Sequence, residues 1–395
     1  MEQNNSERNK SNINPKVKEN STFILLCLCY VLACVYIPFA FFVDMGDWLS
    51  LAAALAVCAI SGVALTRMAG GFKPIGGFAI VIGIFVFLGG AVLPVALFVA
   101  FVSATCIYAG LILTGKLRIV WILPTISIII IFFTTRSLAG VMLSLATLPC
   151  SALLAVSIKR KLPRVSAICR ISAGICIFAV VAFALAVYDL TGELNPSAVS
   201  ALIDSAKTQA TLMLDSAIAE TSELLGGELI GSDVTNIIDL AVSSVFNLLP
   251  AIVITVANIL SYVIHSLFMT VHFTTEEQKK QSLHMLTFDM SLTSGVVYIA
   301  ALVLSLALVT DDLAMYGTAA KNVMLVLAPG LVLTALAGIR ALTLRKGPSC
   351  LGTILYIGVI FMLASLSLYV IAIVALAGAV LTIVAHVAAN KIKKN

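Results

Sequence analysis

The sequence predicts an all-α polytopic membrane protein with about twelve spanning helices, in a range of about eight to twelve. Hydrophobic residues make up 61% of the 395 residues and charged residues only 11%, whereas a water-soluble domain carries roughly 25% charge. Apolar runs that are almost free of charge recur from residue 22 to residue 389. Lys and Arg gather in the polar stretches between these runs, as they do in the cytoplasmic loops of membrane proteins.

The apolar runs divide into six predicted hairpins of spanning helices. A helix needs about 20 apolar residues to cross roughly 30 Å of hydrocarbon. The tracts 75–114 and 351–389 are each about twice that length, so we expect two spans in each, with Gly89, Gly90 and Pro94 marking the turn in the first. The other spans pair as 22–43 with 48–66, 119–135 with 137–157, 171–188 with 246–270, and 291–309 with 322–343.

The basic residues assign a side to each loop. All of the 24 Lys and Arg residues except Arg136, Lys207 and Lys321 fall in seven clusters. The clusters lie within 8–18, 67–73, 116–118, 159–170, 279–280, 340–346 and 391–394. An even number of predicted spans separates neighbouring clusters, so all seven can lie in the cytoplasm, as the positive-inside rule requires. We therefore expect a multi-pass protein of the cell membrane with both termini cytoplasmic.

This scheme gives five parts to the chain. They are a cytoplasmic polar tail (1–21), an N-terminal membrane bundle (22–188), an external acidic amphipathic helical segment (189–245), a C-terminal membrane bundle (246–389) and a basic cytoplasmic tail (390–395).

The external segment has clear signals for the start and end of a helix, and an excess of acidic residues. Asn195 followed by Pro196 is typical of an N-cap and the first helical residue, and Gly226-Gly227 is a stop signal. Nine acidic residues stand against Lys207 alone between Asp189 and Asp239. The charge suits a basic partner or a cationic ligand, and it equally suits a helix face that is simply solvated.

Few ionisable residues fall near the predicted spans, and such residues often mark ligand sites in membranes. Arg136, between two apolar tracts, is a candidate counter-charge for an anionic substrate or a turn residue that extends to the headgroups. Asn258, Tyr262 and His265 recur at i, i+4 and i+7, so they share one helix face. That face either lines a polar cavity or forms hydrogen bonds between helices. We take these four residues as candidate ligand-binding residues.

Other chemistry has no support in the sequence. There is no complete phosphate-binding loop, no His-Glu-x-x-His zinc motif and no Gly-x-Ser-x-Gly elbow, so we expect no intrinsic ATPase, no enzyme activity, no metal and no cofactor. The nine cysteines lie in or beside predicted spans and are best explained as small packing residues. The basic residues are loop anchors, so nucleic-acid binding is not expected.

The order of tracts resembles one known family. An acidic external segment leads into Asn247-Leu248-Leu249-Pro250-Ala251, and Asn322 and a final apolar hairpin follow. This arrangement resembles the YybS-like family of bacterial multi-pass membrane proteins, which is defined by a domain of unknown function. The resemblance implies a membrane bundle whose general form is similar to the substrate-binding membrane subunits of vitamin transporters. It carries no site residues over to this chain.

Two functions from different classes follow. The first is a transporter-like or substrate-binding membrane protein, which would need a separate energising partner and whose small-molecule ligand the sequence does not identify. The second is a non-catalytic envelope or scaffold protein that recruits partners through its external acidic helix.

Overall fold

The computed structural model describes residues 20–43, 47–69, 79, 92–114, 117–201, 203–205, 208, 212, 231–272, 290–308, 314–344 and 368–394. All regular elements in these residues are helices. They are α2 (Asn20–Phe42), α3 (Asp47–Ala69), α5 (Val92–Leu113), α6 (Leu117–Thr135), α7 (Leu138–Leu145), α8 (Thr147–Lys159), α9 (Arg164–Thr191), α11 (Gly231–His272), α13 (Leu292–Ala307), α14 (Ala314–Leu344) and α16 (Leu368–Lys394).

These helices confirm the all-α polytopic membrane class. Within the described residues, eight stretches are long and apolar enough to cross a membrane, and Trp121–Thr135 and Leu292–Ala307 are shorter apolar helices. Each of these ten coincides with a predicted span. The other two predicted spans, in the first halves of 75–114 and 351–389, fall almost wholly outside the described residues. The count of twelve therefore stays a prediction.

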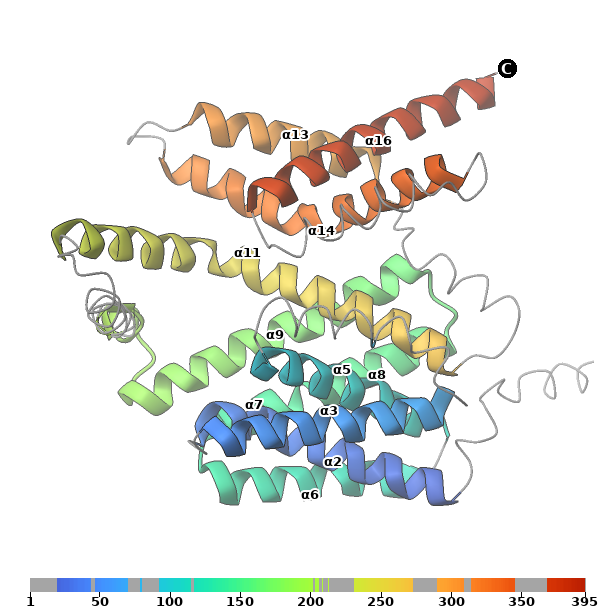
Figure 1. Cartoon of the computed structure of the whole chain (residues 1–395), viewed down its shortest axis with the longest axis vertical. Helices are drawn as coiled ribbons and strands as arrows, with labels where there is room; N and C mark the ends of the chain where they lie inside the picture. The colour runs from blue at the N-terminus through green and yellow to red at the C-terminus, as the bar shows by residue number, and fades with distance from the viewer. Residues whose placement is uncertain are drawn as a thin grey trace, which may run out of the picture.

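The helices form two groups joined by one long helix (Figure 1). The first group contains α2, α3, α5, α6, α7, α8 and α9, which pack on one another in neighbouring pairs. The second group contains α13, α14 and α16, each of which packs on the other two. Helix α11 runs between the groups, with α3, α5 and α9 on one side and α14 on the other.

Helix α5 lies at the centre of the first group because its side chains are small. Ala96, Ala100, Ser103, Ala104 and Gly110 are all fully buried. Small residues allow neighbouring helix backbones to approach closely, which is the main source of packing energy between helices in lipid. The buried residues of α2, α3, α8 and the second half of α11 join α5 in a single hydrophobic cluster.

Proline does not interrupt α2, which runs unbroken through Pro38. Pro38 has no N–H, so the carbonyl of Cys34, four residues earlier, loses its partner within the helix. Ser144 of α7 donates its hydroxyl to that carbonyl. A hydroxyl from a neighbouring helix thus satisfies the group that proline frees, which is how membrane helices tolerate internal proline.

The same arrangement recurs in the second group, where α14 runs unbroken through Pro329. Proline at this position leaves the carbonyl of Leu325 without an intrahelical donor. Thr255 of α11 donates its hydroxyl to the Leu325 carbonyl over 2.9 Å. The helix turn that ends at Pro329 is therefore a point of attachment between α14 and α11.

The predicted span 137–157 is one apolar stretch but two helices, which corrects the single-helix expectation. Helix α7 ends at Leu145 and α8 starts at Thr147, with Ala146 between them. Pro149 explains the break because it gives the carbonyl of residue 145 no donor. At the break, the Thr147 hydroxyl donates to the neighbouring carbonyl of Ser144 over 2.8 Å.

Two other spans extend beyond their predicted limits. Helix α9 begins directly after Pro163 and ends at Gly192, whose φ of 74° is left-handed and terminates the helix. It therefore exceeds the predicted span 171–188 at both ends. Helix α14 starts eight residues before the predicted residue 322. In the external segment, Asn195 accepts the N–H of Ala198 over 2.7 Å, which confirms the predicted N-cap before Pro196.

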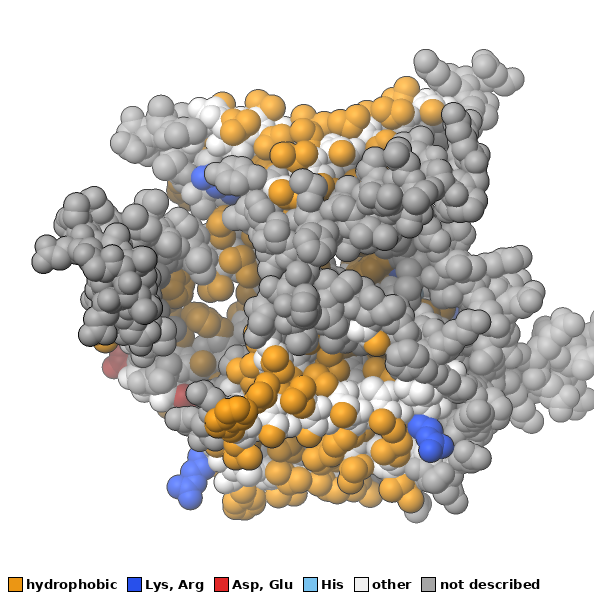
Figure 2. Space-filling view, viewed as in Figure 1, with side chains coloured by type: hydrophobic (Ala, Val, Ile, Leu, Met, Phe, Trp, Pro, Cys, Tyr) orange, Lys and Arg blue, Asp and Glu red, His pale blue; other side chains and the backbone are white. Residues whose placement is uncertain are grey.

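The surface suits a lipid environment. Large exposed apolar side chains cover the outward faces of most of the described helices. In the view of Figure 2 they form a broad hydrophobic face over α2, α3 and α6, and the charged side chains lie towards the two ends. In water such a surface would be an aggregation liability, whereas in a bilayer it is the contact with the lipid tails.

Candidate functional site

The candidate residues on α11 face the helix α9. Asn258 accepts a hydrogen bond from the hydroxyl of Ser172 in α9, with 2.7 Å between the two oxygens. This contact is the interhelical hydrogen bond that the sequence left open as one alternative. The bond fixes the rotation of α11 about its axis, so that the helix face with Asn258, Tyr262 and His265 is turned towards α9. We call this contact region, defined by Asn258, Tyr262, His265 and Ser266 of α11 with Arg164 and Ser172 of α9, the α9–α11 seam.

Arg164 closes one end of the seam. Its guanidinium group lies 4.8 Å from the ring centroid of Tyr262, in cation–π geometry. It also donates a hydrogen bond to the hydroxyl of Ser266 over 3.0 Å. Arg164 is half-buried at the first residue of α9, directly after Pro163. The proline sets the start of the helix and so brings the cation to the edge of the seam.

His265 is the seam residue with spare hydrogen-bonding capacity. Only 7% of its surface is exposed. Within the described part of the chain, its Nδ1 atom is buried and has no hydrogen-bond partner. A buried polar atom without a hydrogen-bond partner is costly.

A second buried histidine lies further along the same helix. His272 packs edge-on against Phe268, with ring centroids 4.1 Å apart. Its Nε2 lies over Gly110 of α5, where a methyl group would collide with the ring. Neither ring nitrogen has a hydrogen-bond partner among the described residues. His272 was not among the residues predicted from the sequence, because a histidine at the end of an apolar span gives no sign of its burial.

Arg136 lies far from the seam. It is exposed at the turn between α6 and α7, where its φ is 50°. The next residue, Ser137, donates to the carboxylate of Asp189 at the far end of α9 over 3.0 Å, and Asp189 also accepts the N–H of Ala139. About 25 residues of α9 separate Asp189 from Arg164, or roughly 38 Å. The structure therefore groups three of the four candidate residues and leaves Arg136 at the opposite end.

These contacts also separate the charges by end. Arg164 bonds to Ser266 near the end of α11. At that same end, the side chains of His272 and Met68 both lie around Gly110, and Met68 directly follows Arg67 in the sequence. Arg67, Lys159 and Arg164 thus share one end of the bundle, as the charge scheme requires. Which compartment each end faces stays a prediction.

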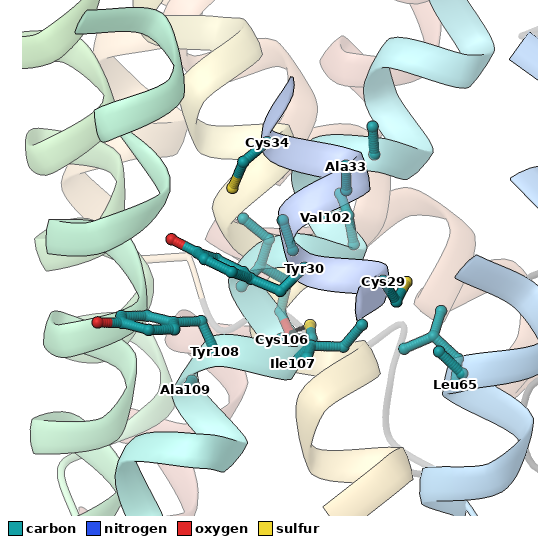
Figure 3. Close-up of a cluster of buried hydrophobic side chains, with 14 of the residues drawn as sticks. Cys29, Tyr30, Ala33, Cys34, Leu65, Val102, Cys106, Ile107, Tyr108 and Ala109 are labelled. Carbon is teal, nitrogen blue, oxygen red and sulfur yellow. Dashed lines mark hydrogen bonds between the residues drawn. The ribbon is translucent and has the colours of Figure 1, made fainter. Parts of the chain in front are cut away.

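The first group contains another buried polar network (Figure 3). Tyr30 of α2 and Tyr108 of α5 stack with ring centroids 4.7 Å apart, and their hydroxyls lie on the same side. The Tyr30 hydroxyl and the Cys34 thiol both bond to the Thr147 hydroxyl, at 3.4 and 3.6 Å. These side chains satisfy one another, so the network stabilises the packing of α2, α5 and α8.

The cysteines take part in this packing. The eight cysteines within the described residues are free thiols. Cys106 contacts the carbonyl of Ile264 over 3.5 Å and thereby connects α5 to α11. No group of three His, Cys, Asp or Glu side chains in the described ranges is placed to hold a metal ion.

Chemically, the seam offers a cation, an aromatic face, hydroxyl groups and an imidazole between two membrane helices. That set can bind and orient a polar group, and it contains no nucleophile paired with a base. Sequence reasoning missed Arg164, because it belongs to a basic loop cluster that the positive-inside rule explains completely. The proline directly before it was the one available signal that it opens a helix.

Comparison with known proteins agrees with this description. Residues 79–378 match the model of a protein family described as predicted membrane protein (DUF2232), whose function is unknown. The match confirms the resemblance to uncharacterised multi-pass membrane proteins. No curated protein and no solved structure matches the chain.

Proposed function

The chain belongs to the DUF2232 family of predicted membrane proteins, and on that premise we propose that it is a transporter-like or substrate-binding membrane protein. Its ligand is a small molecule that enters the α9–α11 seam. The chain has no phosphate-binding loop, so any energy-driven step depends on a separate partner subunit. The protein itself performs no catalysis.

One observation carries this proposal. A half-buried arginine, a tyrosine and a histidine lie together, beside the polar residues Asn258, Ser172 and Ser266, between two largely apolar helices. Ionisable groups within a membrane bundle are expensive and are mostly retained at ligand sites or along substrate pathways. The Asn258–Ser172 hydrogen bond already joins the two helices, and the concentration of further polar groups beside it supports a binding role.

Within the seam the residues have different roles. Asn258 and Ser172 fix the helix rotation, and Arg164 is held in place by Tyr262 and Ser266. His265 lies close enough to Arg164 to interact with it, and its buried Nδ1 atom has no hydrogen-bond partner in the described region. We therefore assign direct ligand contact to His265, and we assign the shape and charge of the entrance to Tyr262 and Arg164.

The proposal is tested by thermal unfolding of the purified protein in lipid nanodiscs, screened against a broad set of metabolites. We expect at least one compound to raise the melting temperature in a concentration-dependent way. His265→Gln should abolish that shift, and His386→Gln, at an exposed histidine of α16, should retain it. Both variants should melt close to the parent protein without ligand.

Two results would contradict the proposal. One is the absence of any stabilising or co-purifying compound in the whole screen. The other is a ligand shift that His265→Gln and Tyr262→Phe leave intact, because the ligand would then bind outside the seam.

The acidic external segment supports a second candidate, an envelope scaffold. The start of this segment is tied to the bundle, since Asp189 accepts hydrogen bonds from Ser137 and Ala139, and Asn195 caps the helix that follows. Deletion of residues 196–226 should then remove in-cell crosslinked partners and leave ligand stabilisation unchanged. Unaltered crosslinking after the deletion would contradict the scaffold function.

A further inference from the structure

The second helix group is packed backbone to backbone. A Cβ at Gly378 of α16 would collide with the carbonyl of Leu331 in α14, and one at Gly295 of α13 would lie 3.1 Å from the carbonyl of Ala379 in α16. At these two points no side chain separates the helix backbones, and the Tyr298 ring fills the core between the three helices. Packing this close resists relative movement, because any displacement forces backbone atoms together. Helices α13, α14 and α16 therefore form one rigid unit, which we call the C-terminal unit.

Within the described helices, the C-terminal unit meets the rest of the bundle mainly through the pair of α14 and α11. Among the described helices, α14 makes the substantial contact with α11. In the described part of the chain, a side-chain hydrogen bond crosses this interface at each of two places. Thr255 donates to the Leu325 carbonyl over 2.9 Å, and the amide of Asn322 donates to the Asn247 carbonyl over 3.1 Å. Each bond joins a side chain of one helix to the backbone of the other.

Both bonds lie next to a proline. Pro329 frees the Leu325 carbonyl that Thr255 binds, and Pro250 frees the carbonyl of Phe246, which is adjacent to the Asn247 carbonyl that Asn322 binds. At Leu325 the helix lacks a backbone bond of its own, and the Asn247 carbonyl lies beside the Phe246 carbonyl that Pro250 leaves without one. Besides the packing of the two helices, the interface is therefore held by single side-chain donors, which are individually weak between membrane helices.

We propose that the α11–α14 interface is a joint at which the C-terminal unit moves as a rigid body against the rest of the bundle. The two side-chain hydrogen bonds of Thr255 and Asn322 hold one of its two positions. Breaking them lets the unit rotate, while the close contacts inside the unit remain intact. Helix α11 also lines the α9–α11 seam, so the joint lies on the helix that carries the proposed binding residues. The movement is a property of the ligand-free protein and stands independently of the proposed function.

The test measures two distances by pulsed electron paramagnetic resonance in nanodiscs. Spin labels on introduced non-natural amino acids leave the native cysteines in place. One pair spans the joint, at the exposed positions Val180 of α9 and Ile373 of α16. The other pair lies within the C-terminal unit, at the exposed positions Val303 of α13 and Val384 of α16.

We expect two populations for the pair that spans the joint and one for the pair within the unit. Thr255→Val keeps the size of the side chain and removes the donor, so it should change the ratio of the two populations about threefold, as the loss of one interhelical hydrogen bond of average strength predicts. Asn322→Ala should shift the ratio in the same direction. Thr270→Val is the matched control, because its hydroxyl bonds to Ser266 within α11, and it should leave both distances unchanged.

Three results would overturn the joint. The first is a single distance across the interface that neither variant alters. The second is a shift of both label pairs together, which would indicate general loosening. The third is an equal shift caused by Thr270→Val, which would show that the effect is not specific to the interface.

Discussion

Removing the hydroxyl of Ser144 tests whether neighbouring helices satisfy the carbonyls that proline frees. In α2, Pro38 deprives the Cys34 carbonyl of its backbone donor, and Ser144 of α7 replaces it. Ser144→Ala removes this donor and changes the volume by a single oxygen atom. We expect the variant to fold into the same bundle with a lower free energy of unfolding.

The magnitude follows from burial and from the membrane setting. A buried carbonyl left without a donor costs about 1–3 kcal/mol, and interhelical hydrogen bonds in membranes average about 0.6 kcal/mol with a maximum near 1.7. Cys34 is only 1% exposed, so water cannot replace the missing donor. We therefore expect Ser144→Ala to cost about 1.5 kcal/mol, near the upper end of the membrane range.

The assay is a double-mutant cycle on the free energy of unfolding, measured by steric trapping in bicelles. Pro38→Ala restores the backbone N–H that reaches the Cys34 carbonyl, so in that background Ser144→Ala should cost only about 0.5 kcal/mol, a coupling of about 1 kcal/mol. Ser127→Ala is the control, because this buried hydroxyl bonds over 3.1 Å to the Leu123 carbonyl of its own helix. The reasoning fails if Ser144→Ala costs the same in both backgrounds or no more than Ser127→Ala.

Two further predictions concern other contacts. Gly378→Ala should lower the free energy of unfolding by about 2 kcal/mol or more, because the added methyl group meets the backbone of Leu331. Gly62→Ala is the control, since nothing lies within 4 Å of its added methyl group, and it should change the free energy of unfolding by less than about 0.5 kcal/mol or raise it. Equal effects of the two variants in the same unfolding assay would contradict the close packing. Arg164→Lys keeps the charge but loses the guanidinium plane over the Tyr262 ring, so it should cost about 0.5–1 kcal/mol, and a variant as stable as the parent would show that the stacking contributes nothing.

The sequence predicted the spans well because the bilayer imposes a length and a composition on each of them. Ten of the predicted spans have helices at the expected places. The break at Ala146 was missed, because hydropathy alone does not distinguish one helix of 22 residues from two shorter ones. Pro149 was visible in the sequence, but proline also occurs inside the unbroken helices α2 and α14, where a hydroxyl from another helix compensates for it.

The candidate site was only partly predictable. Helical spacing correctly placed Asn258, Tyr262 and His265 on one face, since periodicity is a local property. The partner helix is a tertiary property, so neither Ser172 nor Arg164 could be paired with that face from one sequence. Arg136 was grouped with the others on its charge alone, and the α9 contacts at Asp189 place it at the other end of the bundle.

The account depends most on α9 crossing the membrane, with Arg164 at its cytoplasmic end and Asp189 outside. Topology reporters inserted after Lys161 and after Glu193 test this directly, since both sites are exposed and flank the helix. We predict cytoplasmic reporter activity at the first site and external activity at the second. Reporters active on the same side would contradict the spanning helix, the separation of Arg136 from the seam and the binding function built on it.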